Sequence, residues 1–184
     1  MKPTRSMSPP GTYFVTFSTW QRRRLFVVDS YARLFLKILY GYRRQGRFQL
    51  HAFVLMPEHV HMLLTPADNV TLERAMQLIK GGYSHAFGLE FGRKEIWQRG
   101  FTDHRIRNAE DFARHRDYIH KNPVERGLVE RAVEYRCSSA FPGYKLDVWA
   151  GKGATSVVPF PKSARMRILI LRGGARTLQE GHDF

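Results

Sequence analysis

The stretch RFQLHAFVLMPEHVHMLLTP, residues 47–66, decides the fold. Apolar residues recur at every second position through its first half, which is the pattern of a β-strand with one buried face. The residues PEH then lead directly into a second apolar run, HVHMLL. A connection this short holds no crossover helix, so we expect two antiparallel strands joined by a tight turn. The buried register of the first strand is expected to contain Phe48, Leu50, Ala52, Val54 and Met56.

The second strand of this hairpin carries two histidines with one valine between them. Side chains alternate between the faces of a strand, so His59 and His61 project from the same face, with Cα atoms about 6.5 Å apart. Two imidazoles at that spacing can converge on one metal ion. The opposite register, Val60, Met62 and Leu64, is apolar and is expected to be buried. The plain alternative is a pair of histidines with ordinary hydrogen-bond partners.

The flanking sequence predicts the remaining elements from helical spacing of apolar residues and from helix-start signals. Gly81 and Gly82 interrupt the second predicted helix at a cost of about 1 kcal/mol each relative to alanine. They permit either a bend or the close approach of another backbone or a phosphate. We expect a strand over 12–19, a helix from Asp29 or Ser30 to Gly46, a helix over about 71–87, a strand over 103–108, and a helix capped by Asn108.

This order of elements is strand, helix, strand, strand, helix, strand, helix. It predicts an α+β fold of the ferredoxin-like or RRM-like type, an antiparallel sheet with helices on one face. We expect a flexible basic arm over 1–11, a catalytic domain over 12–140, and a loop-rich basic C-terminal extension over 141–184. Within that extension the run RILIL, 167–171, is a candidate strand.

Composition limits the possible functions. Lysine and arginine total 30 against 16 acidic residues, a formal net charge of +14 over 184 residues. That excess favours a polyanionic partner, most simply nucleic acid, over a membrane surface. No uninterrupted apolar run of about 18 residues and no signal-peptide pattern are present. The single cysteine, Cys137, excludes an internal disulfide and a multi-cysteine zinc site. The expected location is the cytoplasm, in association with the nucleoid.

The last predicted helix contains DYIHKNPVERGLV, residues 117–129. Tyr118 and Asn122 are four residues apart and can share one helix face. The pattern Asn-Pro-x-Glu also reads as a helix cap, with Asn122 at the N-cap, Pro123 at the first helical position and a stop at Gly127. On pattern alone the cap is favoured.

Three motifs resemble a known family. HVHMLL (59–64), WQRGFTDHRI (97–106) and YIHKNPVERGLV (118–129), in this order and spacing, resemble the HUH single-tyrosine transposases. The likeness is strongest to the REP-associated tyrosine transposases (RAYTs) and covers about residues 12–140. It implies a ferredoxin-like fold that nicks and rejoins single-stranded DNA at REP-like hairpin sites. By position it implies that His59, His61 and Asn122 are metal ligands and that Tyr118 is the nucleophile.

The implied chemistry is physically reasonable. A tyrosine hydroxyl, with an ordinary pKa of about 10, is a weak nucleophile at neutral pH. A divalent ion, Mg²⁺ or Mn²⁺, can polarise the scissile phosphate. Attack gives a 5′-phosphotyrosine and a free 3′-hydroxyl, so strands can be resealed without ATP. The proton acceptor stays open, because His115 and Lys121 lie three residues to either side of Tyr118.

DNA contacts are expected from basic residues near Trp97 and Phe101, since basic side chains hold phosphates while rings stack on unpaired bases. For Trp97 itself a core position is the favoured reading. The protein is expected to act as a monomer or homodimer on hairpin DNA. Two other functions stay open: a domesticated, non-catalytic nucleic-acid binder, and a water-using phosphodiesterase. The candidate DNA-binding residues are Arg93, Lys94, Arg99, Arg105, Arg107 and Lys80.

Overall fold

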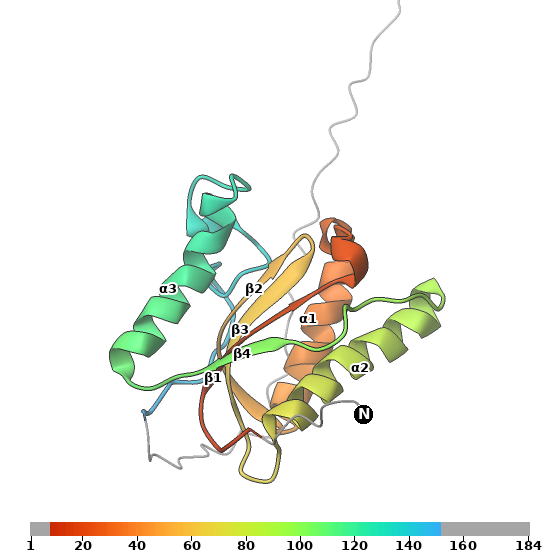
Figure 1. Ribbon diagram of the computed structural model, residues 1–184. Coiled ribbons are helices and arrows are strands. Elements are labelled where there is room, and N and C mark those ends of the chain that lie inside the picture. The colour runs from red at the N-terminus through yellow and green to blue at the C-terminus, as the bar shows by residue number, and fades with distance from the viewer. Residues whose placement is uncertain (1–7, 152–184) are drawn as a thin grey trace, which may run out of the picture.

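The computed structural model describes residues 8–151 and consists of a four-stranded antiparallel sheet with three helices (Figure 1). The strand order across the sheet is β2-β3-β1-β4. This arrangement confirms the predicted ferredoxin-like α+β class. The strands are β1 (Tyr13–Ser18), β2 (Phe48–Met56), β3 (His59–Pro66) and β4 (Thr102–Arg105), and the helices are α1 (Asp29–Arg44), α2 (Leu72–Phe91) and α3 (Ala109–Glu125).

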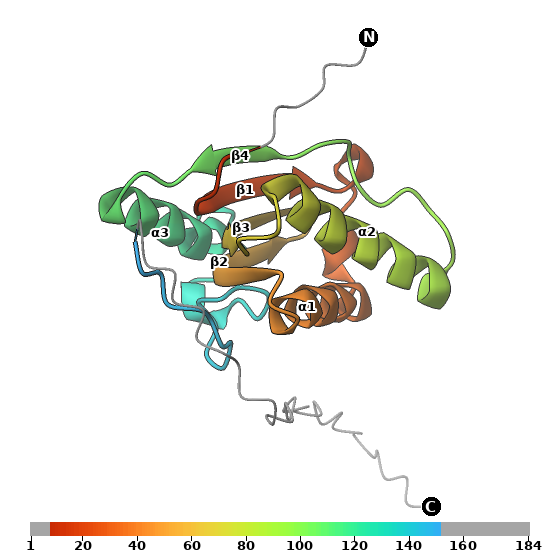
Figure 2. The same cartoon turned by 90° about the horizontal axis from the view of Figure 1, so that it is seen from below.

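Both faces of the sheet are covered. Helices α1 and α2 lie on one face, as expected, whereas α3 lies on the other (Figure 2). The prediction of helices on one face is therefore wrong for α3. Helix α3 lies on the other face because that face is also apolar. Ala52, Val54 and Leu63 of the sheet pack there against Ile119 of α3 in a second core. The site discussed below lies on this α3 side.

A β-bulge in β2 divides one run of alternate apolar residues between the two faces of the sheet. Leu50 pairs with Leu64 and Ala52 pairs with Leu63, so His51 is skipped in the ladder. An extra residue in one strand shifts the alternation of side chains by one position. The expected single buried register is therefore divided: Phe48 and Leu50 belong to the core under α1 and α2, whereas Ala52, Val54 and Met56 belong to the core under α3.

The helix termini follow the sequence signals. The Thr71 hydroxyl accepts the backbone N–H of Arg74 at the start of α2, and the side chain of Asn108 accepts the N–H of Asp111 at the start of α3. Helix α2 continues past the expected end at Phe87 to Phe91. A Cβ at Gly82 would lie 2.7 Å from the Tyr42 ring, so this glycine permits close packing of α1 on α2.

The segment after α3 returns to the sheet and covers the free edge of β2. The N–H of Leu55 donates to the carbonyl of Cys137 at 2.8 Å, and the N–H of Asp147 donates to the carbonyl of Leu50 at 2.9 Å. Arg43 of α1 forms a 2.7 Å ion pair with Asp147. Covering an edge strand prevents unwanted strand pairing. The predicted strand over 167–171 and most of the extension lie outside the described residues, and within 8–151 no helix is long and apolar enough to cross a membrane.

Candidate active site

The two histidines of β3 lie next to each other on the face that α3 covers. Their ring centroids are 4.6 Å apart and their planes are nearly perpendicular, at 80°. His61 is paired with Thr16 of β1 and His59 with Ser18, so both histidines occupy an interior strand of the sheet. Both side chains are buried, at 4% and 5% exposure. The pair is therefore held rigidly by strands on either side.

The Nδ1 atom of each ring has a partner, and this orients the other nitrogen. His59 Nδ1 lies 3.1 Å from the Glu58 carboxylate, which can only accept, so Nδ1 carries the proton. His61 Nδ1 lies 2.7 Å from the Thr16 hydroxyl. The Nε2 atom of His61 is buried and has no hydrogen-bond partner among the described residues. A histidine that binds a metal through Nε2 has this arrangement, with its Nδ1–H donated to a neighbouring oxygen.

Burial keeps both imidazoles neutral. Loss of solvent lowers the pKa of His61 to about 3, and the neighbouring His59 and Arg126 act in the same direction. Burial also lowers the pKa of His59, although Glu58 opposes this. Metal ligation requires the neutral imidazole. The two rings are therefore available as ligands at physiological pH without losing a proton first.

Asn122 does not cap a helix, so the favoured reading from the pattern is wrong. Helix α3 continues through Asn122 and Pro123 to Glu125. Asn122 is 3% exposed, and its Oδ1 atom is buried with no hydrogen-bond partner among residues 8–151. A buried amide oxygen without a partner is destabilising unless something outside the chain satisfies it. The Oδ1 atom of Asn122 is therefore available to bind a ligand.

Tyr118 lies one turn before Asn122 and is exposed to solvent. Its side chain is 41% exposed, and its ring centroid is 5.3 Å from that of His61. Phe14 of β1 stacks on His61 at 5.5 Å and meets the edge of Tyr118 at 5.9 Å. An exposed phenol therefore lies against the buried histidine pair, where a substrate in solvent can reach it.

These donors suit a divalent cation. At this site, the buried atoms with no partner among the described residues are an imidazole nitrogen of His61 and the amide oxygen of Asn122, and the neighbouring His59 offers a second nitrogen. Imidazole suits Mn²⁺ and later transition metals, while amide oxygen and water suit Mg²⁺ and Mn²⁺. We call His59, His61 and Asn122 the open site.

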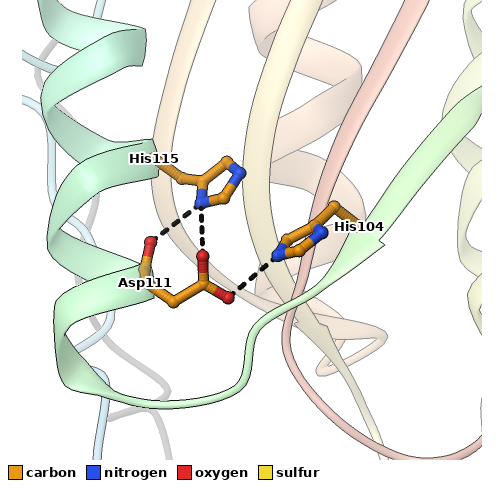
Figure 3. A group of neighbouring side chains, drawn as sticks. All are labelled: His104, Asp111 and His115. Carbon is orange, nitrogen blue, oxygen red and sulfur yellow. Dashed lines mark hydrogen bonds and ion pairs between the residues drawn. The ribbon is translucent and has the colours of Figure 1, made fainter.

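A second group of potential ligands was not recognised in the sequence as a set. His104 of β4 and Asp111 and His115 of α3 have donor atoms within 4.8 Å of one another (Figure 3). Asp111 and His115 are four residues apart on a helix, which is a visible signal. His104 joins them because it pairs with Phe14 across the sheet, and that pairing is not evident from spacing. We call these three residues the closed cluster.

In the closed cluster the carboxylate is already occupied. Asp111 Oδ2 accepts from His104 Nε2 at 2.8 Å and from the backbone N–H of Arg107 at 3.0 Å. Its Oδ1 accepts from Arg114 at 2.6 Å. Burial alone would raise the pKa of Asp111, but the hydrogen bonds from His104, Arg114 and Arg107 outweigh it and hold the pKa below its usual range. A cation at this position would have to displace these donors.

The predicted DNA-binding residues do not all lie in one place. The ammonium of Lys80 donates to the carbonyl of Gln98 at 3.0 Å, and burial lowers the pKa of Lys80 to about 8. Trp97 packs on the core and donates its indole N–H to the Lys80 carbonyl, which confirms the core reading of this tryptophan. Arg93 and Lys94 follow the end of α2 and Arg99 lies in the next loop, whereas Arg105 and Arg107 flank the turn into α3.

Known proteins share this fold. A family model described as "Transposase IS200 like" matches residues 11–122, a span that contains the open site and Tyr118. The REP-associated tyrosine transposase of Escherichia coli (strain K12) is 35% identical over 147 residues, covering 77% of this chain and 86% of that protein. A putative REP-associated tyrosine transposase of Haemophilus influenzae is 26% identical over 156 residues, covering 79% and 88%.

Among solved structures, a REP-associated tyrosine transposase bound to a REP hairpin matches with a TM-score of 0.63 at 28% identity. The match covers 85% of this chain and 99% of that one.

Proposed function

The chain belongs to the family of IS200-like transposases, and on that premise we propose that it nicks and rejoins hairpin DNA through Tyr118. A transposase processes DNA, so the family supplies the class of enzyme. The substrate and the chemical step are our proposal. The substrate is single-stranded DNA with a REP-like hairpin, which the net charge of +14 and the hairpin-bound relative both support.

One observation carries the proposed chemistry: the exposed Tyr118 ring lies 5.3 Å from the ring of His61, whose buried Nε2 has no hydrogen-bond partner in the described part of the chain. A nucleophile must be accessible, and its activating group must be adjacent. Tyr118 is exposed and therefore accessible as the nucleophile, and the adjacent His61 is buried. The arrangement suits attack on a phosphate that approaches from solvent.

The open site would hold Mg²⁺ or Mn²⁺ through His59, His61 and Asn122. A bound divalent cation polarises the scissile phosphate and offsets the negative charge that develops in the transition state. Glu58 fixes the His59 ring by accepting its Nδ1 proton, and the Thr16 hydroxyl fixes the His61 ring by a hydrogen bond to its Nδ1; with a cation on Nε2 of His61, this hydroxyl would be the acceptor. Phe14 holds the rings of His61 and Tyr118 by contact with both.

The reaction of Tyr118 conserves the energy of the phosphodiester. Its hydroxyl oxygen bonds to phosphorus, and the bond from phosphorus to the 3′-oxygen breaks. The products are a 5′-phosphotyrosine and a free 3′-hydroxyl, which can attack in reverse to reseal a strand.

The test is covalent capture. A labelled hairpin oligonucleotide with a 5′ single-stranded extension is incubated with the protein and Mn²⁺ and then run on a denaturing gel. We expect an adduct with wild type and none with Tyr118→Phe. Tyr31→Phe is the matched control, because it removes a hydroxyl from α1 on the opposite face, and it should form the adduct normally.

Other outcomes separate the rival functions. Cleavage that survives Tyr118→Phe would identify water as the nucleophile, and mass spectrometry would then find no nucleotide on tyrosine. Hairpin binding without any cleavage would identify a domesticated binding protein. Its affinity would fall steeply with salt, and His59→Ala would leave that affinity unchanged.

A further inference from the structure

We propose that His115, oriented by Asp111, accepts the proton of Tyr118 during cleavage. This inference rests on the proposed function and assigns the step that the open site does not provide. The tyrosine hydroxyl must lose its proton as its oxygen bonds to phosphorus, and a positioned base accelerates such a step. His115 lies on the same helix as Tyr118, three residues earlier.

The hydrogen bonds of His115 fix which nitrogen is basic. Its Nδ1 lies 2.8 Å from the main-chain carbonyl of Asp111 and 3.2 Å from the Asp111 carboxylate. Both of these oxygens can only accept, so Nδ1 carries the proton. In neutral His115 the lone pair is therefore on Nε2, and Figure 3 shows Nε2 pointing away from Asp111. This is the tautomer that a general base requires.

The ring of His115 is also held in place by packing. Phe14 contacts one side at a centroid distance of 4.8 Å, and His104 stacks on it at 4.7 Å with an interplanar angle of 20°. Asp111 is itself anchored by the Arg107 N–H and by Arg114. The imidazole is therefore oriented by two aromatic neighbours and one buried carboxylate. A base that is already oriented loses little entropy in the reaction.

Phe14 links this base to the nucleophile. The Phe14 ring contacts both His115, at 4.8 Å, and Tyr118, at 5.9 Å. Residues three apart on a helix share a face. In the complex with DNA, the proposal requires Nε2 to reach the phenol directly or through one water. The rival acceptor, Lys121, is exposed, and an ammonium has no lone pair with which to accept a proton.

The step balances as follows. The proton of the Tyr118 hydroxyl moves to Nε2 of His115 as the oxygen bonds to phosphorus. The 3′-oxygen leaves and takes a proton from water. The Asp111 carboxylate stabilises the imidazolium that forms. When the strand is resealed, a 3′-hydroxyl attacks phosphorus and gives its proton to water, and His115 returns its proton to the departing tyrosine oxygen. His115 therefore serves as base and acid in turn, and Asp111 serves as its positioning residue.

The primary test measures the single-turnover rate of adduct formation with saturating Mn²⁺. His115→Gln retains an amide that can donate to Asp111 but lacks a basic nitrogen, and His115→Ala leaves space for a small base. Both should slow adduct formation by about 100-fold or more while hairpin affinity is unchanged. Added imidazole should restore part of the rate of His115→Ala, and it should not accelerate wild type. His85→Ala, which removes an exposed histidine of α2, is the matched control.

A double-mutant cycle tests Asp111. If Asp111 acts through His115, Asp111→Asn slows wild type but adds little to the defect of His115→Ala. A purely structural role would slow both backgrounds equally, and that result would overturn this part of the proposal. Thermal melting of each variant shows whether it is folded.

The outcomes distinguish this inference from the proposed function. No adduct with folded wild type rejects both. Normal adduct formation by wild type and His115→Gln rejects His115 alone. A large defect in Lys121→Ala that imidazole does not repair, with His115→Ala normal, assigns the proton to Lys121 instead.

Discussion

The open site and the closed cluster lie on the same face of the sheet and contain similar side chains. They differ in whether their buried polar atoms have hydrogen-bond partners. In the open site, His61 Nε2 and Asn122 Oδ1 are buried and find no hydrogen-bond partner within the residues that the structure describes. In the closed cluster, Asp111 accepts from a histidine, an arginine and a backbone N–H. Within residues 8–151, no buried polar atom of the closed cluster lacks a partner.

The difference separates a site with unused ligand atoms from a network whose carboxylate is already hydrogen-bonded. Both regions contain residue types that bind metals: histidine and asparagine in the open site, and histidine and aspartate in the closed cluster. Three donor atoms within 4.8 Å of one another make the closed cluster the more obvious candidate. A cation needs lone pairs that nothing else uses. Buried polar atoms normally find partners, so those that do not are informative about function. The comparison predicts that substitutions in the open site reduce metal-dependent activity with little loss of stability. In the closed cluster, substitution of Asp111 lowers stability and leaves metal binding unchanged.

The largest effect is expected from His61→Ala. Removal of one of the two proposed imidazole ligands should slow Mn²⁺-dependent adduct formation about 1,000-fold, because a bound cation contributes several kcal/mol to stabilising the transition state. The free energy of unfolding should change little, since the lost packing is offset by removal of an unsatisfied buried nitrogen. Gel assays and urea melts measure the two quantities. Severe unfolding together with normal activity would reverse the comparison.

The next effect is on stability, from Asp111→Asn. Loss of the buried anionic acceptor should lower the free energy of unfolding by about 2–3 kcal/mol while Mn²⁺ affinity is unchanged. Because the pKa of Asp111 is lowered in the folded protein, its contribution is present above the usual carboxyl pKa of about 3.9 and is lost as pH falls below that. Urea melts at several pH values measure it.

Asp117→Asn is the control for this variant. Asp117 is an exposed acid on the same helix whose partner is the exposed Arg116, so its removal should cost less than about 1 kcal/mol. Equal losses from the two substitutions would contradict the distinction between a buried network and a surface pair.

The pH dependence of stability sharpens the comparison further. The folded protein keeps His61 neutral down to a pKa of about 3, whereas unfolded histidine protonates at about 6.5. Between these values the unfolded state binds more protons, so stability falls as pH falls. In EDTA, His61→Ala should reduce this slope by up to about 1.4 kcal/mol per pH unit. Identical slopes for wild type and variant would show that the site is not desolvated.

The smallest effect is expected from Thr16→Val. This change keeps the shape of the side chain but removes the hydroxyl beside His61 Nδ1. Loss of a group that orients a metal ligand should weaken Mn²⁺ binding about tenfold. Thr102→Val is the control, because Thr102 pairs with Thr16 on the neighbouring strand but lies at the exposed edge. Equal affinities in the two variants would show that Thr16 does not orient the ring.

Local patterns explain which parts of the fold were predictable. The helix signals at Thr71 and Asn108 act within one turn, and the structure has both caps. The antiparallel hairpin followed from the length of its turn. The bulge at His51 was not predictable, because it depends on how β2 pairs with β3. The cap assigned to Asn122 was wrong because helix α3 does not end before Pro123.

The candidate site was also predictable only in part. The alternation of β3 indicated that His59 and His61 share a face, and the family motif pointed to Tyr118 and Asn122. The closed cluster was missed as a unit, because its members come from β4 and α3 and meet only when Phe14 and His104 pair across the sheet.

The sequence by itself determined the order of elements, the antiparallel hairpin, the positive charge and the membership of the histidine pair and Tyr118 in one motif set. Each of these depends on neighbouring residues or on composition. Only the tertiary structure decided which nitrogens and oxygens have partners. Those partners come from distant parts of the chain, as with Thr16 beside His61 and His104 beside Asp111. The free lone pairs that define the open site are therefore a property of the folded chain.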